Sequence, residues 1–375
     1  MKRIICFLLV FSFLLLPAHA AVSAGEITSP SAIVMEKSTG KILFEKDAHT
    51  RLPPASVTKV MTLLLVMEAL ESGKLNLEDS ISVSEHAASM GGSQVFLSPG
   101  EQMSVNDLLK ATVIASGNDS AVALAEAIAG SEAGFVELMN NRAKELGMSD
   151  TTFVNCTGLD AEGHLTSAHD IAIMSRELIR HDEIKKYSTT WMDSLRNGAF
   201  TLANTNKLIR SYQGITGLKT GSTGNAKYCL SATAERDGME LIAAIMAAPS
   251  SKERFADAAT LLNFGFANYS LYNAAEDLSL SDVPVILGKN ACVGIKPSGS
   301  TYVLTEKSKT SSLVKNIEIT ENVKAPVKEG QTLGKIEILS DGEILQTIPL
   351  VASEEVEKLG FAGIFKKFAE VIFMK

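Results

Sequence analysis

The sequence predicts a two-domain α/β (α+β) protein, in which an antiparallel sheet flanked by helices with an inserted helical lobe is followed by a small all-β domain. Three observations predict this fold class. A chain of 375 residues is long for one compact core. Strand-like segments stand on both sides of a helical middle, so one sheet is assembled from distant segments. After about residue 270, short strands separated by Gly, Pro, Asn and Asp replace the helices.

The elements of the first domain, 25–270, follow from periodicity and from turn residues. The apolar runs 32–35 and 41–44 flank Ser38-Thr39-Gly40, which predicts a hairpin. Helical periodicity, closed in several cases by glycine, predicts helices over 56–72, 105–129, 133–146, 169–180 and 251–264. Apolar runs predict strands around 217–219, 228–235 and 240–246. Cys229 falls in one of these strands, where we expect a small core residue.

The second domain, 275–350, is predicted from strand-like segments over 283–287, 301–304, 317–319 and 335–339. The tail, 353–375, is different, because its apolar side chains recur on one helical face at Phe361, Ile364, Phe365, Phe368 and Ile372. Seven charges between Glu354 and Glu370 argue against a membrane span. We therefore expect an amphipathic membrane-anchor helix at the membrane surface, with a helix docked on the β domain as the alternative.

Residues 1–20 are predicted to be a signal peptide. Lys2 and Arg3 precede an apolar run over 4–16, which is short for a stable membrane span, and Ala18-His19-Ala20 fits a signal-peptidase site. An uncleaved anchor is the alternative. The mature protein is therefore expected to work outside the cytoplasm.

Charge and cysteine usage exclude several classes of function. The net charge of −8 and the absence of a long basic run predict no nucleic-acid partner. Cys156, Cys229 and Cys292 are odd in number and widely spaced, so neither a disulfide framework nor a zinc pattern is indicated. His164 and His169 match no metal-binding spacing and are expected to be structural or surface residues. No cofactor and no metal are predicted.

Three short motifs in fixed order carry the chemistry, and the first is Ser56-Val57-Thr58-Lys59. On a helix, positions i and i+3 share a face with Cβ atoms about 5–6 Å apart, so Lys59 can reach the Ser56 hydroxyl. A helix N-terminus also favours developing negative charge. Ser38/Lys41 and Ser312/Lys315 have the same spacing but do not open a long apolar helix. Taken alone, a capping serine with a solvated lysine is the simpler interpretation.

The second motif, Ser116-Gly117-Asn118, interrupts an apolar segment. Burying such polar groups is costly unless they are paired or used. Ser104-Val105-Asn106 matches the same pattern, and a polar break in a helix is the alternative interpretation.

The third motif, Lys219-Thr220-Gly221, ends a strand-like run. Gly221 would let a ligand lie close against the strand, whereas the alternative is a hairpin with an exposed lysine. Base chemistry needs a neutral Lys59, and both burial and a second cation such as Lys219 would lower its pKa.

Together the motifs match the S-x-x-K, S-x-N and K-T-G pattern of penicillin-binding proteins and serine β-lactamases. With the further stretches 92–100, 204–208 and 254–265, the chain resembles the low-molecular-mass penicillin-binding proteins over nearly its whole mature length. These are serine-type D-alanyl-D-alanine carboxypeptidases of the S11-like family with an added C-terminal β domain. The resemblance implies a β-lactamase/transpeptidase-like catalytic domain that removes the terminal D-alanine from peptidoglycan stem pentapeptides and is acylated by β-lactam antibiotics.

The resemblance also implies a catalytic role for three residues, Ser56, Lys59 and Ser116, and a substrate-binding role for Asn118. Ser56 attacks the peptide bond between the two D-alanines, and Lys59 takes its proton. Ser116 relays a proton to the leaving amine, and Asn118 holds the substrate amide and Lys59.

Binding roles are implied for the third motif. Lys219 and Thr220 bind the substrate's terminal carboxylate, and Gly221 is a further substrate-binding residue. The backbone N–H groups of Ser56 and Ser222 form the oxyanion hole. Many relatives carry histidine at the position of Ser222, which leaves substrate preference and rate open.

Several alternatives share the motifs. A class A β-lactamase would add a glutamate in an E-x-x-L-N segment, which we do not find at a comparable distance after Asn118. Endopeptidase activity on D-alanine cross-links would use the same site. A non-catalytic wall-binding scaffold would not need the intact Ser56 and Lys59. The expected partners are stem peptides, β-lactams and, through the C-terminal helix, the membrane surface. The expected location is the outer face of the bacterial cytoplasmic membrane, the periplasm or the cell wall.

Overall fold

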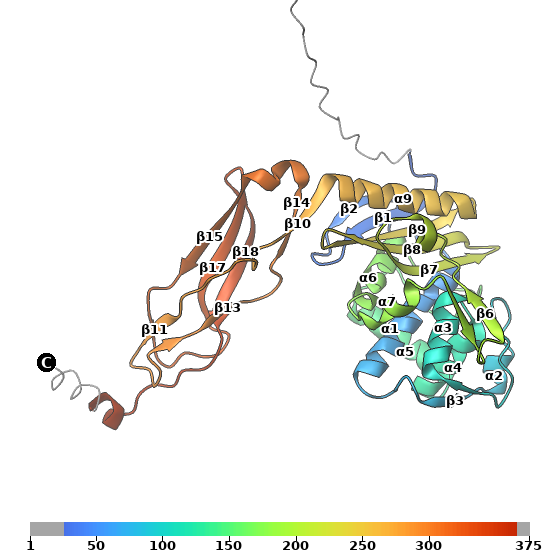
Figure 1. The fold of residues 1–375 in the computed structure, drawn as a ribbon, viewed down its shortest axis with the longest axis horizontal. Helices are drawn as coiled ribbons and strands as arrows, with labels where there is room; N and C mark the ends of the chain where they lie inside the picture. Colours follow the sequence, from blue (N-terminus) through green and yellow to red (C-terminus); the bar gives the residue numbers. More distant parts are fainter. Residues whose placement is uncertain (1–25, 366–375) are drawn as a thin grey trace, which may run out of the picture.

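The structure, a computed structural model, describes residues 26–365 and contains an α/β domain followed by an all-β domain (Figure 1). The predicted signal peptide and residues 366–375 of the predicted tail helix lie outside the described residues.

The first domain is built on one five-stranded antiparallel sheet in the order β2-β1-β9-β8-β7. The predicted hairpin supplies β1 and β2, and the later strands pair beside it, so the sheet does join distant segments. Its strands are β1 (Ser31–Glu36), β2 (Ile42–Lys46), β7 (Ile215–Thr223), β8 (Lys227–Arg236) and β9 (Met239–Ala248). Cys229 is fully buried in β8, as predicted.

Helices cover both faces of this sheet. Helix α9 (Ser251–Asn268) packs on one face, around a core that includes Leu241 and Leu261. The helical lobe packs on the other face around a larger core (Figure 1). Its helices are α1 (Lys59–Glu71), α2 (Glu85–Ala88), α3 (Val105–Ile114), α4 (Asn118–Ala129), α5 (Glu132–Glu145), α6 (Ala168–Leu178) and α7 (Glu183–Ser188).

The prediction of one helix over 105–129 is wrong in its middle. Helix α3 ends at Ile114 and α4 begins at Asn118, because Ser116 adopts φ 62 and Gly117 takes the N-cap position of α4. The left-handed backbone of Ser116 cannot continue a right-handed helix. The polar trio therefore forms a tight corner between two helices.

Short elements complete the domain at the edges of the lobe. Two small antiparallel pairs join β3 with β4 and β5 with β6. The elements are β3 (Ser80–Ser82), β4 (Gln102–Ser104), β5 (Met192–Leu195), β6 (Phe200–Ala203) and α8 (Leu208–Ser211).

The second domain is all-β and is wider than the predicted 275–350. It holds a four-stranded sheet, β13-β18-β17-β15, with smaller sheets β12-β11-β16 and β10-β14. Strand β10 begins directly after α9, and β18 runs past residue 350. Its elements are β10 (Tyr269–Asn273), β11 (Val283–Ile286), β12 (Cys292–Val293), β13 (Ile295–Pro297), β14 (Tyr302–Glu306), η3 (Lys307–Ser312), β15 (Leu313–Ile319), β16 (Val323–Lys324), β17 (Thr332–Ser340) and β18 (Glu343–Ala352).

The predicted tail helix over 353–375 is wrong at its start. Residues 353–360 are not helical and bridge to the β domain through Val327↔Val356 and Gly288↔Lys358. Val356 is only 1% exposed and belongs to a core cluster of that domain, so burial of this side chain holds the segment out of a helix. A helical segment begins at Phe361.

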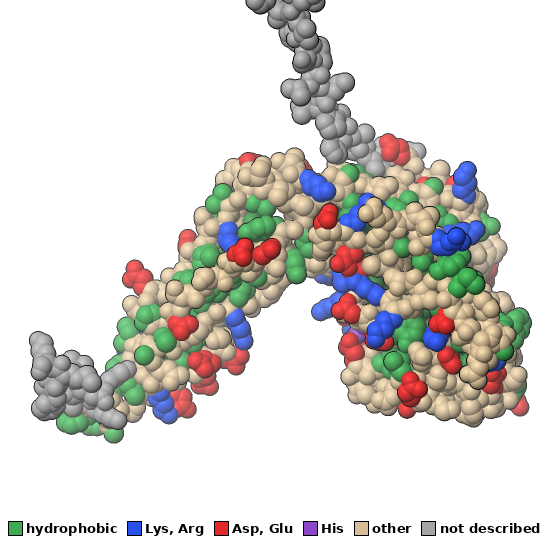
Figure 2. Space-filling view, viewed as in Figure 1, with side chains coloured by type: hydrophobic (Ala, Val, Ile, Leu, Met, Phe, Trp, Pro, Cys, Tyr) green, Lys and Arg blue, Asp and Glu red, His purple; other side chains and the backbone are tan. Residues whose placement is uncertain are grey.

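Within residues 26–365, no helix is long and apolar enough to cross a bilayer. Figure 2 shows acidic and basic side chains interspersed on the face seen there, without a continuous basic patch.

Candidate active site

Ser56 lies in a tight 3₁₀ turn, η2 (Ala55–Thr58), that runs directly into α1. The predicted α-helix therefore starts three residues later, at Lys59. The turn is closed by the Val57 N–H donating to the Pro54 carbonyl at 3.2 Å. Ala55 has φ 49, a left-handed conformation that costs a non-glycine residue roughly 1–2 kcal/mol. The nucleophile candidate is thus held on a strained backbone.

Two glycines let other segments support this turn at backbone distance. A Cβ on Gly158 would stand 1.8 Å from the Ala55 carbonyl oxygen, and one on Gly221 would stand 2.8 Å from the Ser56 nitrogen. The loop after α5 and strand β7 therefore both pack directly against the backbone of the Ser56 turn. The sequence predicted that the missing side chain of Gly221 leaves room for a ligand. In the structure the Ser56 turn occupies that space, so the glycine permits close packing between β7 and the turn.

Lys59 connects the first motif to the second. Its Nζ lies 3.1 Å from Ser56 Oγ, 2.5 Å from Asn118 Oδ1 and 2.8 Å from the Thr157 carbonyl oxygen. Lys59 is fully buried, whereas Ser56 is half-buried. The amine is therefore fixed beside a hydroxyl that solvent and ligands can reach.

Burial lowers the pKa of Lys59 to about 7, although Cys156 and Asp119 act in the opposite direction. A neutral amine has two N–H groups and one lone pair. The carbonyl oxygens of Asn118 and Thr157 accept the two N–H groups, so the lone pair is directed at Ser56 Oγ. This arrangement suits a general base.

The second and third motifs meet through Ser116 and Lys219. The Lys219 ammonium donates to Ser116 Oγ at 2.7 Å and to the Thr220 carbonyl at 3.0 Å. Both side chains are buried. Burial lowers the pKa of Lys219 well below its usual value, and the positive charges of Lys59 and Arg254 lower it further. A ligand carboxylate beside Lys219 would supply the missing counter-charge.

Strand β7 is an edge of the sheet and carries the third motif along it. Thr220 Oγ1 donates to Thr205 Oγ1 at 2.6 Å, and the Arg254 guanidinium donates to the Gly221 carbonyl at 3.0 Å. Ser222 is exposed and directly follows the glycine that meets the Ser56 nitrogen. An edge strand offers backbone groups for an extended peptide to pair with.

Several supporting residues have no motif signature in the sequence. The Asp119 carboxylate accepts from the Val95 and Leu97 N–H groups at 3.0 and 3.1 Å, which holds the 92–100 stretch beside the site. Asn118 Nδ2 donates to the Gly91 carbonyl at 2.6 Å. The position of an acid in the first turn of α4 was the available signal for Asp119.

His164 is a structural residue behind the nucleophile turn, as expected. Its Nδ1 accepts from the Val154 N–H at 2.9 Å, so the ring proton sits on Nε2 and donates to Thr58 Oγ1 at 2.7 Å. Burial lowers the pKa of His164 to about 4, opposed by Asp160. The neutral ring therefore joins the 153–166 loop to the turn that carries Ser56.

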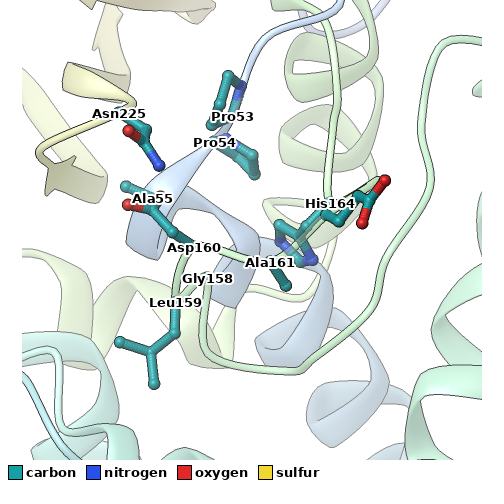
Figure 3. Close-up of a pocket in the computed structure, with 10 residues that line it drawn as sticks. Pro53, Pro54, Ala55, Gly158, Leu159, Asp160, Ala161, His164 and Asn225 are labelled. Atoms are coloured by element: carbon teal, nitrogen blue, oxygen red, sulfur yellow. The ribbon is translucent and has the colours of Figure 1, made fainter.

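A pocket of about 250 Å³ lies beside the contact between His164 and the Ser56 turn (Figure 3). Figure 3 shows the Pro53–Ala55 segment facing the 158–164 loop, with Asn225 at the rim. Ser56, Lys59, Ser116 and Lys219 do not line it. The pocket therefore flanks the motif site and does not contain the candidate chemistry.

Comparisons with known proteins agree with this geometry. Residues 18–250 match the peptidase S11 family model, described as D-alanyl-D-alanine carboxypeptidase, and residues 266–358 match the model of the penicillin-binding protein 5 C-terminal domain. The chain is 44% identical to the D-alanyl-D-alanine carboxypeptidase DacF of Bacillus subtilis, over 98% of each chain.

Solved structures give the same result. Penicillin-binding protein 5 of Haemophilus influenzae superposes with a TM-score of 0.77 at 31% identity, covering 90% of this chain and all of that one. An ampicillin-bound penicillin-binding protein D2 of Listeria monocytogenes superposes with a TM-score of 0.59 at 34% identity, covering 64% of this chain and 98% of that one. The chain therefore belongs to the peptidase S11 family of serine D-alanyl-D-alanine carboxypeptidases, and it carries that family's penicillin-binding protein 5 type C-terminal domain.

Proposed function

We propose that the protein removes the terminal D-alanine from peptidoglycan stem pentapeptides through an ester on Ser56. The observation that carries this proposal is the position of the buried Lys59 amine, 3.1 Å from Ser56 Oγ, with two carbonyl oxygens holding its N–H groups. Such an amine can take the hydroxyl proton as Oγ attacks the carbonyl carbon of the D-alanyl-D-alanine bond.

The leaving amine needs a proton as the peptide C–N bond breaks. Ser116, whose Oγ lies 2.7 Å from Lys219 Nζ, is our candidate for relaying that proton to the amine. Free D-alanine then departs, and the rest of the stem peptide stays on Ser56 as an ester. Asn118 is proposed to hold both Lys59 and the substrate amide, because its side chain already joins Lys59 to the Gly91 backbone.

The third motif is proposed to recognise the end of the substrate. Lys219 and Thr220 would bind the terminal carboxylate beside the backbone of Gly221, and a charge-assisted hydrogen bond of this kind contributes about 1.5–3 kcal/mol. The backbone N–H groups of Ser56 and Ser222 would stabilise the oxyanion, where one donor is worth about 3–4 kcal/mol in the transition state. The adjacency of Gly221 to the Ser56 nitrogen supports this pairing.

The reaction ends when water attacks the ester and returns the proton to Ser56. A β-lactam would form an ester on the same hydroxyl, and the ampicillin-bound structure of the Listeria relative supports acylation of this chain by that class of drug.

We further propose that the catalytic unit, 25–270, acts outside the cytoplasm and is held at a membrane surface by the tail. The sequence of residues 1–20 supports export. Phe361 and Phe365 support the attachment, because they are 88% and 71% exposed at the start of the tail. The β domain, 275–350 by sequence, would then stand between the bilayer and the catalytic unit.

The proposal is tested by intact-protein mass spectrometry after addition of benzylpenicillin, together with D-alanine release from a pentapeptide. We expect one adduct on the native chain and none on Ser56→Ala, with D-alanine release lost in the same variant. Ser38→Ala is the matched control, because Ser38 has the same spacing to a lysine but lies in the β1–β2 turn.

The outcomes separate the alternatives. An adduct that survives in Ser56→Ala would refute the serine ester. Rapid β-lactam turnover without D-alanine release would instead identify a β-lactamase.

A further inference from the structure

Three side chains of the types that serve as metal ligands lie close together at the surface of the first domain. They belong to His49, Asp150 and His169. His49 precedes the Ser56 turn, Asp150 follows α5, and His169 lies in the first turn of α6. One ligand atom of each lies within 4.8 Å of the others. His49 Nδ1 is 2.7 Å from Asp150 Oδ2, and the two imidazole centroids are 4.3 Å apart.

Neighbouring hydrogen bonds hold the side chains of Asp150 and His169 in place. The buried Asp170 carboxylate contacts His169 Nδ1 at 3.2 Å and accepts from the Asp150 N–H at 2.9 Å. A carboxylate on one ring nitrogen fixes the histidine tautomer and leaves the lone pair on the other, as in carboxylate–histidine–metal sites. The Ser167 hydroxyl donates to Asp150 Oδ2 at 3.0 Å. By contrast, the His49 side chain is 61% exposed and has room to rotate.

We propose that His49, Asp150 and His169 bind a divalent transition-metal ion of the zinc class, with water as the fourth ligand. Two imidazole nitrogens and a carboxylate oxygen suit zinc, whereas magnesium and calcium prefer oxygen ligands alone. Bonds of about 2.0–2.1 Å place the ligand atoms of a tetrahedral zinc about 3.4 Å apart. The 2.7 Å contact and the 4.8 Å limit bracket that separation, so rotation of His49 completes the geometry.

Two positive features act against a cation here. Arg51 Nε donates to the Asp150 carbonyl at 3.0 Å, and the N-terminus of α6 carries a partial positive charge. The carboxylates of Asp150 and Asp170 oppose both. The Arg51 side chain is also exposed, so solvent and salt screen its charge.

A metal at this position would join the segment that leads into the Ser56 turn to the loop between α5 and α6. The β-bridges Leu52↔Thr166 and Thr152↔Leu165 already connect these segments. The ion would therefore stabilise the support of the nucleophile without entering the reaction. This inference does not depend on the proposed role of Ser56.

The test uses the full chain without an affinity tag and with Cys292→Ser, because Cys292 is an exposed thiol that could bind the same ions. Zn²⁺ binding is measured by calorimetry, and Co²⁺ substitution is followed by the visible absorption of four-coordinate cobalt. We expect one equivalent of metal and a higher Tm with Zn²⁺. His49→Ala and Asp150→Asn should each weaken binding by about tenfold or more and remove the Tm increase.

His86→Ala is the matched control, because His86 is an exposed histidine that contacts a carboxylate, Glu132, at 2.8 Å elsewhere in the domain. It should bind zinc as the parent does. Circular dichroism and Trp191 fluorescence check that each variant is folded, and substitution of the exposed His49 is least able to disturb folding. The inference is overturned if the parent binds no stoichiometric metal, or if folded His49→Ala binds it as tightly as His86→Ala.

Discussion

In the proposed mechanism, the protonation state of Lys59 sets the pH at which Ser56 can be activated. Its pKa is lowered to about 7, chiefly by burial, and only the neutral amine has a lone pair for the Ser56 proton. Below that pH the ammonium dominates and acylation should slow. We therefore expect the second-order rate of acylation by a fluorescent penicillin to rise with pH and to reach half its plateau near pH 7.

A variant at Asp119 distinguishes this group from other titrating residues. The Asp119 carboxylate raises the pKa of Lys59, so Asp119→Asn, which keeps an acceptor oxygen, should lower that pKa and move the rising limb to lower pH. Asp237→Asn, at an exposed carboxylate in the turn between β8 and β9, should leave the limb in place. A rising limb that does not move in Asp119→Asn would contradict the assignment of Lys59 as the titrating base.

Motif residues could be predicted at this scale because their side chains carry the chemistry. Spacing and flanking residues singled out Ser56 and Lys59 among three matching pairs, and the structure brings these two within hydrogen-bond distance. The Thr157 carbonyl could not be predicted, because a backbone acceptor has no sequence signature. The cluster around His49 was missed for a related reason: its ligands come from three segments, and His49 and Asp150 are 101 residues apart.

At the scale of elements, the fit between the Ser56 turn and its neighbours depends on glycine. Gly158 and Gly163 lie in the same loop with φ 88 and 79, but a Cβ at 158 would meet the Ala55 carbonyl at 1.8 Å, whereas one at 163 meets nothing within 4 Å. Gly158→Ala should therefore combine backbone strain with a clash. We expect it to destabilise the domain by about 3 kcal/mol or more and to abolish acylation.

Gly163→Ala isolates the backbone contribution. It should cost only about 1–2 kcal/mol and retain acylation. Urea unfolding monitored by Trp191, the one tryptophan of the chain, measures both variants in the catalytic domain. Equal effects of the two substitutions would show that the contact with Ala55 is unimportant.

The loop that carries His164 should make stability depend on pH. The folded-state pKa of about 4 lies below the usual 6.5, so the unfolded chain takes up the proton first as the pH falls. The associated stability is complete above pH 6.5 and is lost as the pH falls through 4, amounting to about 3 kcal/mol. Unfolding free energies from Trp191 fluorescence between pH 7 and 4 should show this loss.

His164→Asn removes the titration while keeping a side chain that can both accept and donate. We expect its unfolding free energy to fall less steeply over the same pH range than that of the native chain. Parallel curves would assign the acid sensitivity to other groups. The role of this histidine was outside the reach of sequence patterns, because it depends on two hydrogen bonds to distant segments, Val154 and Thr58.

Periodicity located most elements but not their breaks. The segment 105–129 keeps a helical pattern on both sides of Ser116. The polar residues Ser116-Gly117-Asn118 were therefore the sequence feature that could have indicated the corner between α3 and α4. The predicted tail helix was started too early, at residue 353, although its apolar face begins only at Phe361 and Val356 upstream of it is buried in the β domain. At Ser116 a local backbone conformation overrides a repeating pattern, and at Val356 a tertiary contact sets the boundary.

For the whole molecule, the start of the tail helix at Phe361 decides which deletion can test the proposed membrane attachment. Deleting 353–375 would remove Val356 from the core of the β domain together with its bridge to Val327. Loss of one fully buried valine costs about 1.5–3 kcal/mol, so that variant should lower the Tm of the β domain whatever the tail does. Deleting 361–375 leaves these contacts intact.

We expect the chain ending at residue 360 to keep the native Tm and D-alanine release while losing sedimentation with anionic vesicles. Phe361→Ser combined with Phe365→Ser should weaken that sedimentation in the full-length chain, because these two exposed rings are the apolar contacts nearest the β domain. If the shortened chain sediments as well as the full one, attachment must lie elsewhere. Unchanged catalysis in the shortened chain would then still place the reaction upstream of the tail, since within residues 26–365 the side-chain hydrogen bonds of Ser56, Lys59 and Lys219 are made to the first domain.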